Sequence, residues 1–165
     1  MIFNPFAFAD FPQSTMAKWS MIPSAEGPFS GLDAMARYCF GLLYNRYQLS
    51  MRKHSEGDSR FSEVRTVRLC DAFPYRPSMR NDTSEISMSY AFCIYTQGDL
   101  AREMGCTDRT VRRCLEDLRR AGVIETKREG YNGALRFFFP PVVYEYFVRE
   151  DRLKEYNAIL AGREG

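Results

Sequence analysis

The spacing of apolar residues predicts one long buried helix near the start of the chain. Over residues 30–49 apolar side chains recur at helical intervals on a wide stripe, as expected for a central core helix. Ser30 and Asp33 lie at the start of this segment in a capping-box pattern, which predicts that Ser30 caps the helix. The stripe consists of Leu32, Met35, Ala36, Cys39, Leu42, Leu43 and Tyr47.

After this helix the helical spacing of apolar residues ends. Residues 50–85 are charged and contain prolines at 74 and 77, which favours a long loop with one strand near 63–70. Residues 86–95 then alternate, which predicts one half-buried strand. Its predicted faces are Ile86, Met88, Tyr90, Phe92 and Ile94 on one side, and Ser87, Ser89, Ala91 and Cys93 on the other.

Two helices and a hairpin follow. Thr96 precedes a short helix that Gly105 ends, and Thr107 precedes a second helix over 108–121 that Gly122 stops. Residues 123–128 and 134–139 form two strands around an Asn-Gly loop, a typical hairpin signal. Helix, tight turn, helix and hairpin together predict a winged helix-turn-helix in an α+β, mainly α fold.

We therefore expect three parts in the chain. Residues 1–20 are an aromatic N-terminal arm, and residues 21–140 form the winged-helix domain with a long insertion at 50–90. Residues 141–165 return to helical spacing and predict a C-terminal helix. In the last predicted strand, Phe137, Phe138 and Phe139 are consecutive, so two rings are expected in the core and one facing outward.

Composition narrows the function classes. No apolar run is long enough for a membrane span, and the N-terminus has no basic region of a signal peptide. Five cysteines without a CxxC pair disfavour a disulfide framework and a zinc site, so we expect reduced, mostly buried thiols in a cytoplasmic, bacterial protein. No catalytic triad, phosphate loop or metal-ligand spacing is visible, so neither an enzyme nor a cofactor is expected.

Net charge is only +2, so a nucleic-acid function depends on where the charges lie. On the 108–121 helix, Val111, Cys114, Leu115 and Leu118 share the core side. Arginine early on a recognition helix can bind guanine edges or phosphate. The expected contacts are Thr107, Arg109, Thr110, Arg112, Arg113 and Arg120 on the helix, with Lys127, Arg128, Tyr131 and Asn132 on the hairpin.

A solvated arginine-rich helix face is the alternative interpretation of this pattern. The hairpin adds a second basic element beside the helix, and the combination favours binding of double-stranded DNA. Glu116 and Asp117 dilute the positive field, and Glu116 can pair with Arg112 or Arg120 at helical spacing.

Two stretches resemble a known family. "MIPSAEGPFSGLDAMARYCFGLLYNRYQLS" and "FCIYTQGDLAREMGCTDRTVRRCLEDLRRAGVIETKREGYNGALRFFF" are similar to the N-terminal domain of the RepA-type plasmid replication initiators. The resemblance implies an origin-binding winged helix that often dimerises on repeated plasmid sites. It implies recognition-helix contacts at Thr107, Arg109, Thr110 and Arg113, and a wing at 127–132.

The chain departs from this family in two ways. The segment 50–90 is longer than the family's usual connection, and members carry a second, C-terminal domain that this sequence does not include. Contacts with the replication machinery are expected to depend on that further domain.

Three functions remain open at this point: an initiator at a plasmid origin, a transcriptional regulator of the same fold, and a primosomal protein-interaction module without direct DNA contact. A homodimer is also expected, because both ends of the chain are rich in apolar side chains, although arm and tail could instead pack within one subunit. The residues concerned are Phe3, Phe6, Phe8, Phe11, Val143, Phe147, Tyr156 and Leu160.

Overall fold

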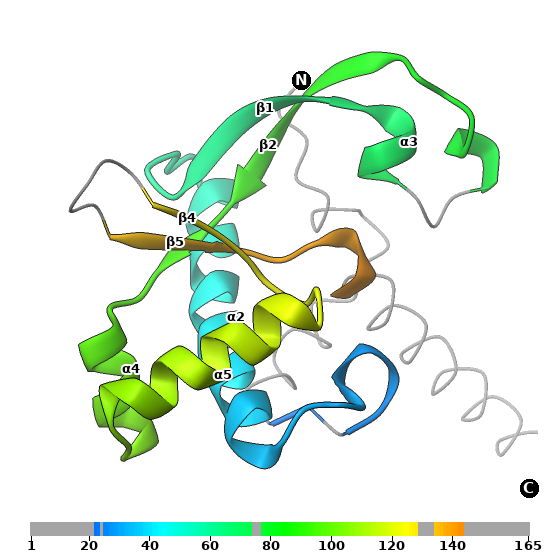
Figure 1. Ribbon diagram of the computed structural model, residues 1–165. Coiled ribbons are helices and arrows are strands. Elements are labelled where there is room, and N and C mark those ends of the chain that lie inside the picture. Colours follow the sequence, from blue (N-terminus) through cyan, green and yellow to red (C-terminus); the bar gives the residue numbers. More distant parts are fainter. Residues whose placement is uncertain (1–21, 24, 74–76, 129–133, 144–165) are drawn as a thin grey trace, which may run out of the picture.

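The computed structural model describes residues 22–23, 25–73, 77–128 and 134–143, and it is an α+β winged helix. Figure 1 shows α4 and α5 at one end of the molecule and a long β1–β2 ribbon at the other. The elements are η1 Gly27–Phe29, α2 Ala34–Ser55, β1 Ser62–Arg68, α3 Leu69–Ala72, η2 Pro77–Met79, β2 Glu85–Ala91, β3 Cys93–Ile94, α4 Gln97–Met104, α5 Asp108–Arg120, β4 Glu125–Arg128 and β5 Leu135–Phe138.

Helix α2 is the predicted core helix, with a different cap and a longer C-terminal end. Asp33, not Ser30, is its N-cap: the Asp33 carboxylate accepts from the N–H of Ala36 at 2.8 Å. Ser30 instead follows η1, where its N–H donates to Gly27 O. The predicted stripe is buried or half-buried, and Phe40, Tyr44 and Met51 extend it. This buried surface wraps far round α2, as expected for a helix packed on several sides.

An aromatic cluster fixes α2 against the end of β5. The Phe139 ring lies 5.3 Å from Phe40, 5.2 Å from Tyr44 and 4.7 Å from Tyr47, measured between ring centroids. Edge-on ring pairs at this spacing add to the gain from burying their apolar area. The cluster therefore ties the first long helix to the C-terminal end of β5.

Helices α4 and α5 follow the predicted boundaries closely. Thr96 caps α4 by accepting from the N–H of Asp99, and Gly105 ends it in the left-handed region with φ 65°. Gly122, at φ 71°, follows the last turn of α5. Both glycines stand where a side chain would be strained. The two helices pack on each other and on α2, so the tight turn is held by the core.

The hairpin after α5 is the wing, and β3 completes its sheet. The strand order is β3-β5-β4, with both pairs antiparallel. Thr126 lies opposite Phe137 and Lys127 opposite Arg136, so alternate residues face opposite sides of the sheet. One side, with Phe137 and Cys93, belongs to the main core.

The strand predicted near 63–70 is confirmed as β1, but the long loop predicted around it over 50–85 is wrong. The single strand predicted over 86–95 is also wrong, because it divides into β2 and β3. Helix α2 runs on to Ser55, and β1 pairs with β2 over their full length in an antiparallel ribbon. The alternating stretch breaks at Phe92, whose N–H donates to Phe61 O, so β2 joins the ribbon and β3 joins the wing sheet. At this change of sheet the consecutive residues Ala91, Phe92 and Cys93 are all buried.

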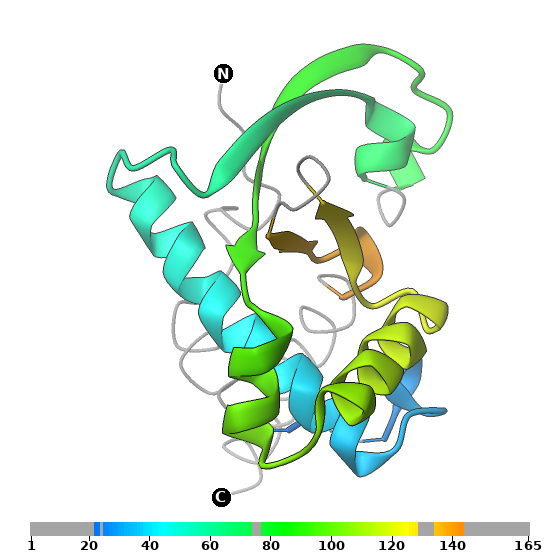
Figure 2. The ribbon, with the colours of Figure 1, turned by 60° about the vertical axis from the view of Figure 1, so that its left-hand side comes forward.

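The ribbon carries a small core of its own at the end away from α4 and α5 (Figure 2). Ala72, Phe73 and Met88 form this satellite core, with Val67, Leu69 and Tyr90 among the side chains packed on it. Figure 2 shows α3 at the same end. An isolated two-stranded ribbon is marginal in water, and this cluster supplies the apolar contact that one ribbon face needs.

The expectation of one outward-facing phenylalanine is also wrong. Phe137, Phe138 and Phe139 are exposed by 0%, 3% and 5%. Phe138 lies on the sheet face opposite Phe137, but there the Phe92 ring covers it at 5.5 Å and the Arg65 guanidinium lies 4.3 Å from its centroid. The ribbon thus buries the wing-sheet face that sequence alone leaves open.

The expected C-terminal helix begins at residue 141, but only its first residues are described. Val143, expected on its associating surface, is instead fully buried in the main core, whereas Val142 is 42% exposed. The aromatic arm, the wing tip and the remaining tail lie outside the described residues, together with their predicted roles.

Candidate nucleic-acid interface

Helix α5 presents its outer side to solvent. Val111, Cys114, Leu115 and Leu118 are at most 1% exposed and hold its inner side in the core. Thr107 caps the helix: its hydroxyl oxygen accepts from the N–H of Thr110 at 3.3 Å and lies 3.2 Å from the Thr110 hydroxyl. Figure 1 shows α5 at the front of the molecule, with no described element across its outer side.

Arg109 and Arg112, in the first two turns of α5, are the cations best placed to bind an anion. Both side chains are exposed, and within the described residues neither forms an ion pair. They project from the helix end where unsatisfied N–H groups add positive potential. Arginine in this position can fork onto a phosphate or a guanine edge without first giving up another partner.

Arg113 is held differently from these two. Its guanidinium donates to the Asp33 carboxylate at 2.7 Å and lies 3.3 Å from Asp117. The N–H of Ala36 and then Arg113 stabilise the charged form of Asp33 and lower the pKa of that carboxyl below 3.8. The predicted DNA contact at Arg113 stays a prediction, but the guanidinium links α5 to the start of α2.

The C-terminal half of α5 is less positive than its arginine count suggests. Glu116 lies 3.5 Å from Arg119 and 3.4 Å from Arg120, so the expected pairing of Glu116 with Arg120 is confirmed. Arg119 also donates to the Thr126 hydroxyl at 3.0 Å, which ties α5 to β4. Arg120 is 75% exposed, and an exposed pair of this kind is weak enough to exchange for a phosphate.

The two basic residues of β4, Lys127 and Arg128, face opposite sides of the sheet. Arg128 shares a face with Thr126, the residue that α5 contacts, and within the described chain it has no ion-pair partner. Lys127 shares a face with Arg136 and lies 3.1 Å from the Glu63 carboxylate of β1. Tyr131 and Asn132 lie outside the described residues, so their predicted contacts stay untested.

Sequence reasoning missed the acids that hold these cations. Asp33 is 80 residues from Arg113, and Glu63 is 64 residues from Lys127. Arg65 was missed too: it bonds Glu63 at 2.6 Å and Glu125 at 3.2 Å. The alternation of 62–68 shows that Glu63 and Arg65 share a strand face. It does not predict that the wing packs against this face.

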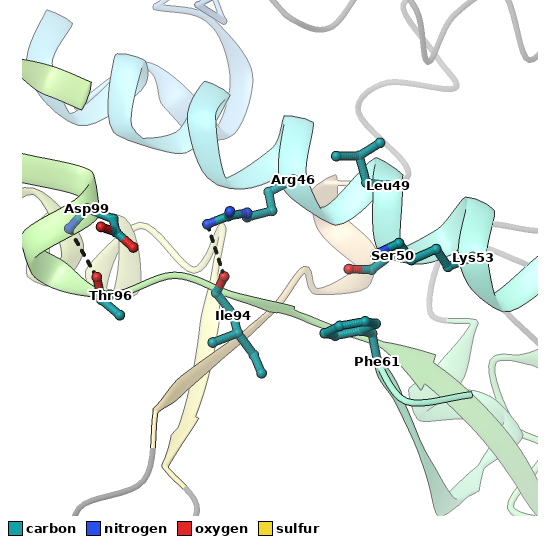
Figure 3. Close-up of a pocket in the computed structure, with 8 residues that line it drawn as sticks. All are labelled: Arg46, Leu49, Ser50, Lys53, Phe61, Ile94, Thr96 and Asp99. Carbon is teal, nitrogen blue, oxygen red and sulfur yellow. Dashed lines mark hydrogen bonds between the residues drawn. The ribbon is translucent and has the colours of Figure 1, made fainter. Parts of the chain in front are cut away.

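A hollow of about 310 Å³ lies beside the C-terminal half of α2 (Figure 3). Its two cations already have neighbours: Arg46 donates to Ile94 O and stacks on Tyr95, and Lys53 lies over the Phe61 ring. Asp99 adds an acid to the lining. The mixed charge makes this hollow a weaker anion site than the outer side of α5.

The five cysteines are free thiols, with Cys39, Cys93 and Cys114 buried. Burial raises the pKa of Cys39 and of Cys93 to about 12, which keeps both thiols neutral and unreactive. Among the described residues no cluster of His, Cys, Asp and Glu could hold a metal ion. The helices in this part of the chain include none long and apolar enough to cross a bilayer.

Residues 68–133 match the family model of the Crp-like helix-turn-helix domain. The matched segment contains α4, the turn, α5 and the start of the wing, so this part of the chain is a helix-turn-helix. The match supports binding of double-stranded DNA by this segment. No curated protein matches the chain.

Two solved structures resemble the chain at low identity. One is described as "N-Terminal domain of DNA binding protein", with 13% identity, a TM-score of 0.45, and coverage of 88% of this chain and 95% of the other. The second is "Structure of MDR initiator", with 15% identity, a TM-score of 0.44, and coverage of 87% and 98%. With both scores below 0.5, neither likeness adds to the argument.

Proposed function

We propose that the chain binds a specific duplex DNA site, with α5 in the major groove and the wing on the neighbouring backbone. The observation that carries the proposal is that Arg109 and Arg112, in the first two turns of α5, are exposed and form no ion pair within the described residues. Recognition helices contact base edges from this end. The helix-turn-helix match over 68–133 supports the same interpretation of these turns.

The test compares two variants that lose the same positive charge. A variant with Arg109→Ala and Arg112→Ala should bind a selected duplex at least tenfold more weakly, because each arginine fork that is removed costs about 1–3 kcal/mol. The slope of log K against log salt should also become shallower, by about 0.9 for each phosphate that is no longer neutralised. The control, Arg52→Ala with Arg80→Ala, removes two exposed arginines away from α5.

Equal affinity in the double variant and the control would refute the assignment of α5. No retardation of any duplex by the wild-type chain at low salt would instead favour a protein-interaction module. Circular dichroism of each variant distinguishes weaker DNA binding by a folded chain from unfolding.

We further propose that the bound site is a plasmid origin and that the chain serves a replication initiator. The support is the resemblance of residues 21–50 and 92–139 to the RepA-type N-terminal domain. A transcriptional regulator of this fold would use the same contacts, so only the target separates the two. Footprinting on the DNA around the gene should show protection of directly repeated sites; a single protected operator at a promoter would favour the regulator.

The initiator proposal includes a homodimer in the cytoplasm, and replication-machinery contacts made through a further domain. Ile22 and Val142, which border the arm and the tail, are 50% and 42% exposed. Apolar side chains at both borders suit a contact with a second copy. Sedimentation of the intact chain beside a version lacking 1–15 and 144–165 tests this: a monomer in both cases at tens of micromolar would contradict the dimer.

A further inference from the structure

Glu63 of β1 binds cations from three different strands. Its carboxylate lies 2.6 Å from Arg65 Nε on β1, 3.1 Å from Lys127 Nζ on β4 and 3.5 Å from an Arg136 nitrogen on β5. The Glu63 side chain is only 15% exposed. One carboxylate therefore joins the ribbon to both strands of the wing.

The wing register explains why these cations converge. Lys127 lies opposite Arg136, and Glu125 lies opposite Phe138, so all four project from the same face of the wing sheet. Arg65 lies across that face, with its guanidinium 4.3 Å from the Phe138 centroid and 3.2 Å from Glu125. In Figures 1 and 2 the ribbon passes over the wing sheet, on the far side from α5.

Glu63 remains charged in this setting. Burial opposes the charge, but hydrogen bonds from Arg65 and Lys127 outweigh burial and bring the pKa of Glu63 below its ordinary value. Arg136 is mostly buried, at 19% exposure, whereas Lys127 is 54% exposed and is the cation of this group that could reach solvent. Lys127 is thus a wing cation with an acid already beside it.

We propose that Glu63 is a positioning residue that holds Lys127 on the ribbon side of the wing and lowers the number of phosphate contacts the wing makes. The inference rests on the proposed DNA binding and assigns a role to the ribbon within it. Arg128 lies on the opposite face, on the side of α5, and is the basic residue in the described part of the wing that stays free to contact DNA there. The ribbon thus limits non-specific attraction to the DNA backbone and leaves α5 to select the site.

The first test removes the acid. In Glu63→Gln, Lys127 loses its strongest partner, and the salt slope of duplex binding should steepen by about 0.9, the value for one added phosphate contact. At 0.1 M salt this corresponds to binding tighter by up to about eightfold. Glu85→Gln is the matched control, since it removes the same charge from the far end of the ribbon and makes no ion pair in the described chain.

The second test removes the cation in both backgrounds. Lys127→Ala should leave the slope of the wild type unchanged within about 0.3 but reverse the steepening in Glu63→Gln, a coupling that a double-mutant cycle isolates. A structural role alone would weaken binding in Glu63→Gln without steepening the slope. That result, or a shallower slope for Lys127→Ala in the wild type, would overturn the proposal.

The two proposals fail in different ways. If the wild-type chain binds no duplex, DNA binding itself fails and no slope can be measured. If the wild type binds and loses affinity on removal of Arg109 and Arg112, but Glu63→Gln matches Glu85→Gln, only the role of Glu63 is wrong. Urea unfolding of each variant identifies any general loss of the fold.

Discussion

Asp33 makes two contacts that can be removed separately. Its carboxylate caps α2 through the N–H of Ala36 at 2.8 Å and accepts from Arg113 of α5 at 2.7 Å. Asp33→Ala removes both contacts, whereas Asp33→Asn keeps a cap acceptor and removes the charge. Comparing the two variants shows which contact stabilises the junction between α2 and the candidate recognition helix.

The structure indicates that the cap matters more than the ion pair. Replacing an N-cap Asp by Ala costs about 1 kcal/mol, within a range of about 0.5–2. The Arg113 and Asp33 side chains are 47% and 52% exposed, and water and salt screen a pair so exposed. We expect Asp33→Ala to lower the free energy of unfolding by about 1–1.5 kcal/mol, and Asp33→Asn by less than about half of that.

Urea unfolding followed by circular dichroism measures both variants, and the slope with denaturant should stay constant. The melting temperature of Asp33→Ala should fall by about 2–5 °C for a chain of this size. Equal losses in the two variants would show that the charge, and not the cap, supports the junction.

The same pair predicts a pH dependence. The pKa of Asp33 is below 3.8 in the folded chain, so its charge stabilises the fold above about pH 4 and this contribution is lost as pH falls through the folded pKa. The stability gap between wild type and Asp33→Asn should therefore be constant between pH 5 and pH 7 and should narrow in acid as the Asp33 carboxyl is protonated. A gap that persists in acid would contradict the assignment.

Three further predictions concern the packing and backbone that hold α4 and α5 in place, and the burial of the cysteines. Leu115→Ala, at a side chain only 1% exposed, should cost about 2–5 kcal/mol in urea unfolding, and a loss below about 1 kcal/mol would mean that the core is not packed there. Gly105→Ala should lower the free energy of unfolding by about 1 kcal/mol, because Gly105 has a φ of 65°. Gly98→Ala should not destabilise, because Gly98 lies inside α4 and a Cβ added there meets free space. Similar losses for both variants would refute the strain argument. With a thiol reagent at pH 8, Cys70 and Cys106 should react in the native state and the three buried cysteines only on unfolding, so five fast thiols would contradict the burial.

The sequence by itself determined the elements that depend on local signals. The caps at Thr96 and Thr107 and the glycine stops at Gly105 and Gly122 use contacts within a few residues. The stripe of Val111 and Leu118 fixed the inner side of α5, and therefore the side on which Arg109 lies. Period and capping are properties of short segments, so a helix-turn-helix with a wing could be predicted without coordinates.

Tertiary structure decided what the polar side chains of the site contact. An arginine is available to bind DNA only if no acid of the chain already pairs with it. The acids that pair with Arg65 and Arg113 are Glu125 and Asp33, which lie 60 and 80 residues away in the sequence. Tertiary structure also decided that 86–95 divides between two sheets at Phe92 and that the ribbon buries Phe138. Residue spacing records which face of a strand a side chain occupies. The partner that covers this face is set by long-range packing, which has no local period.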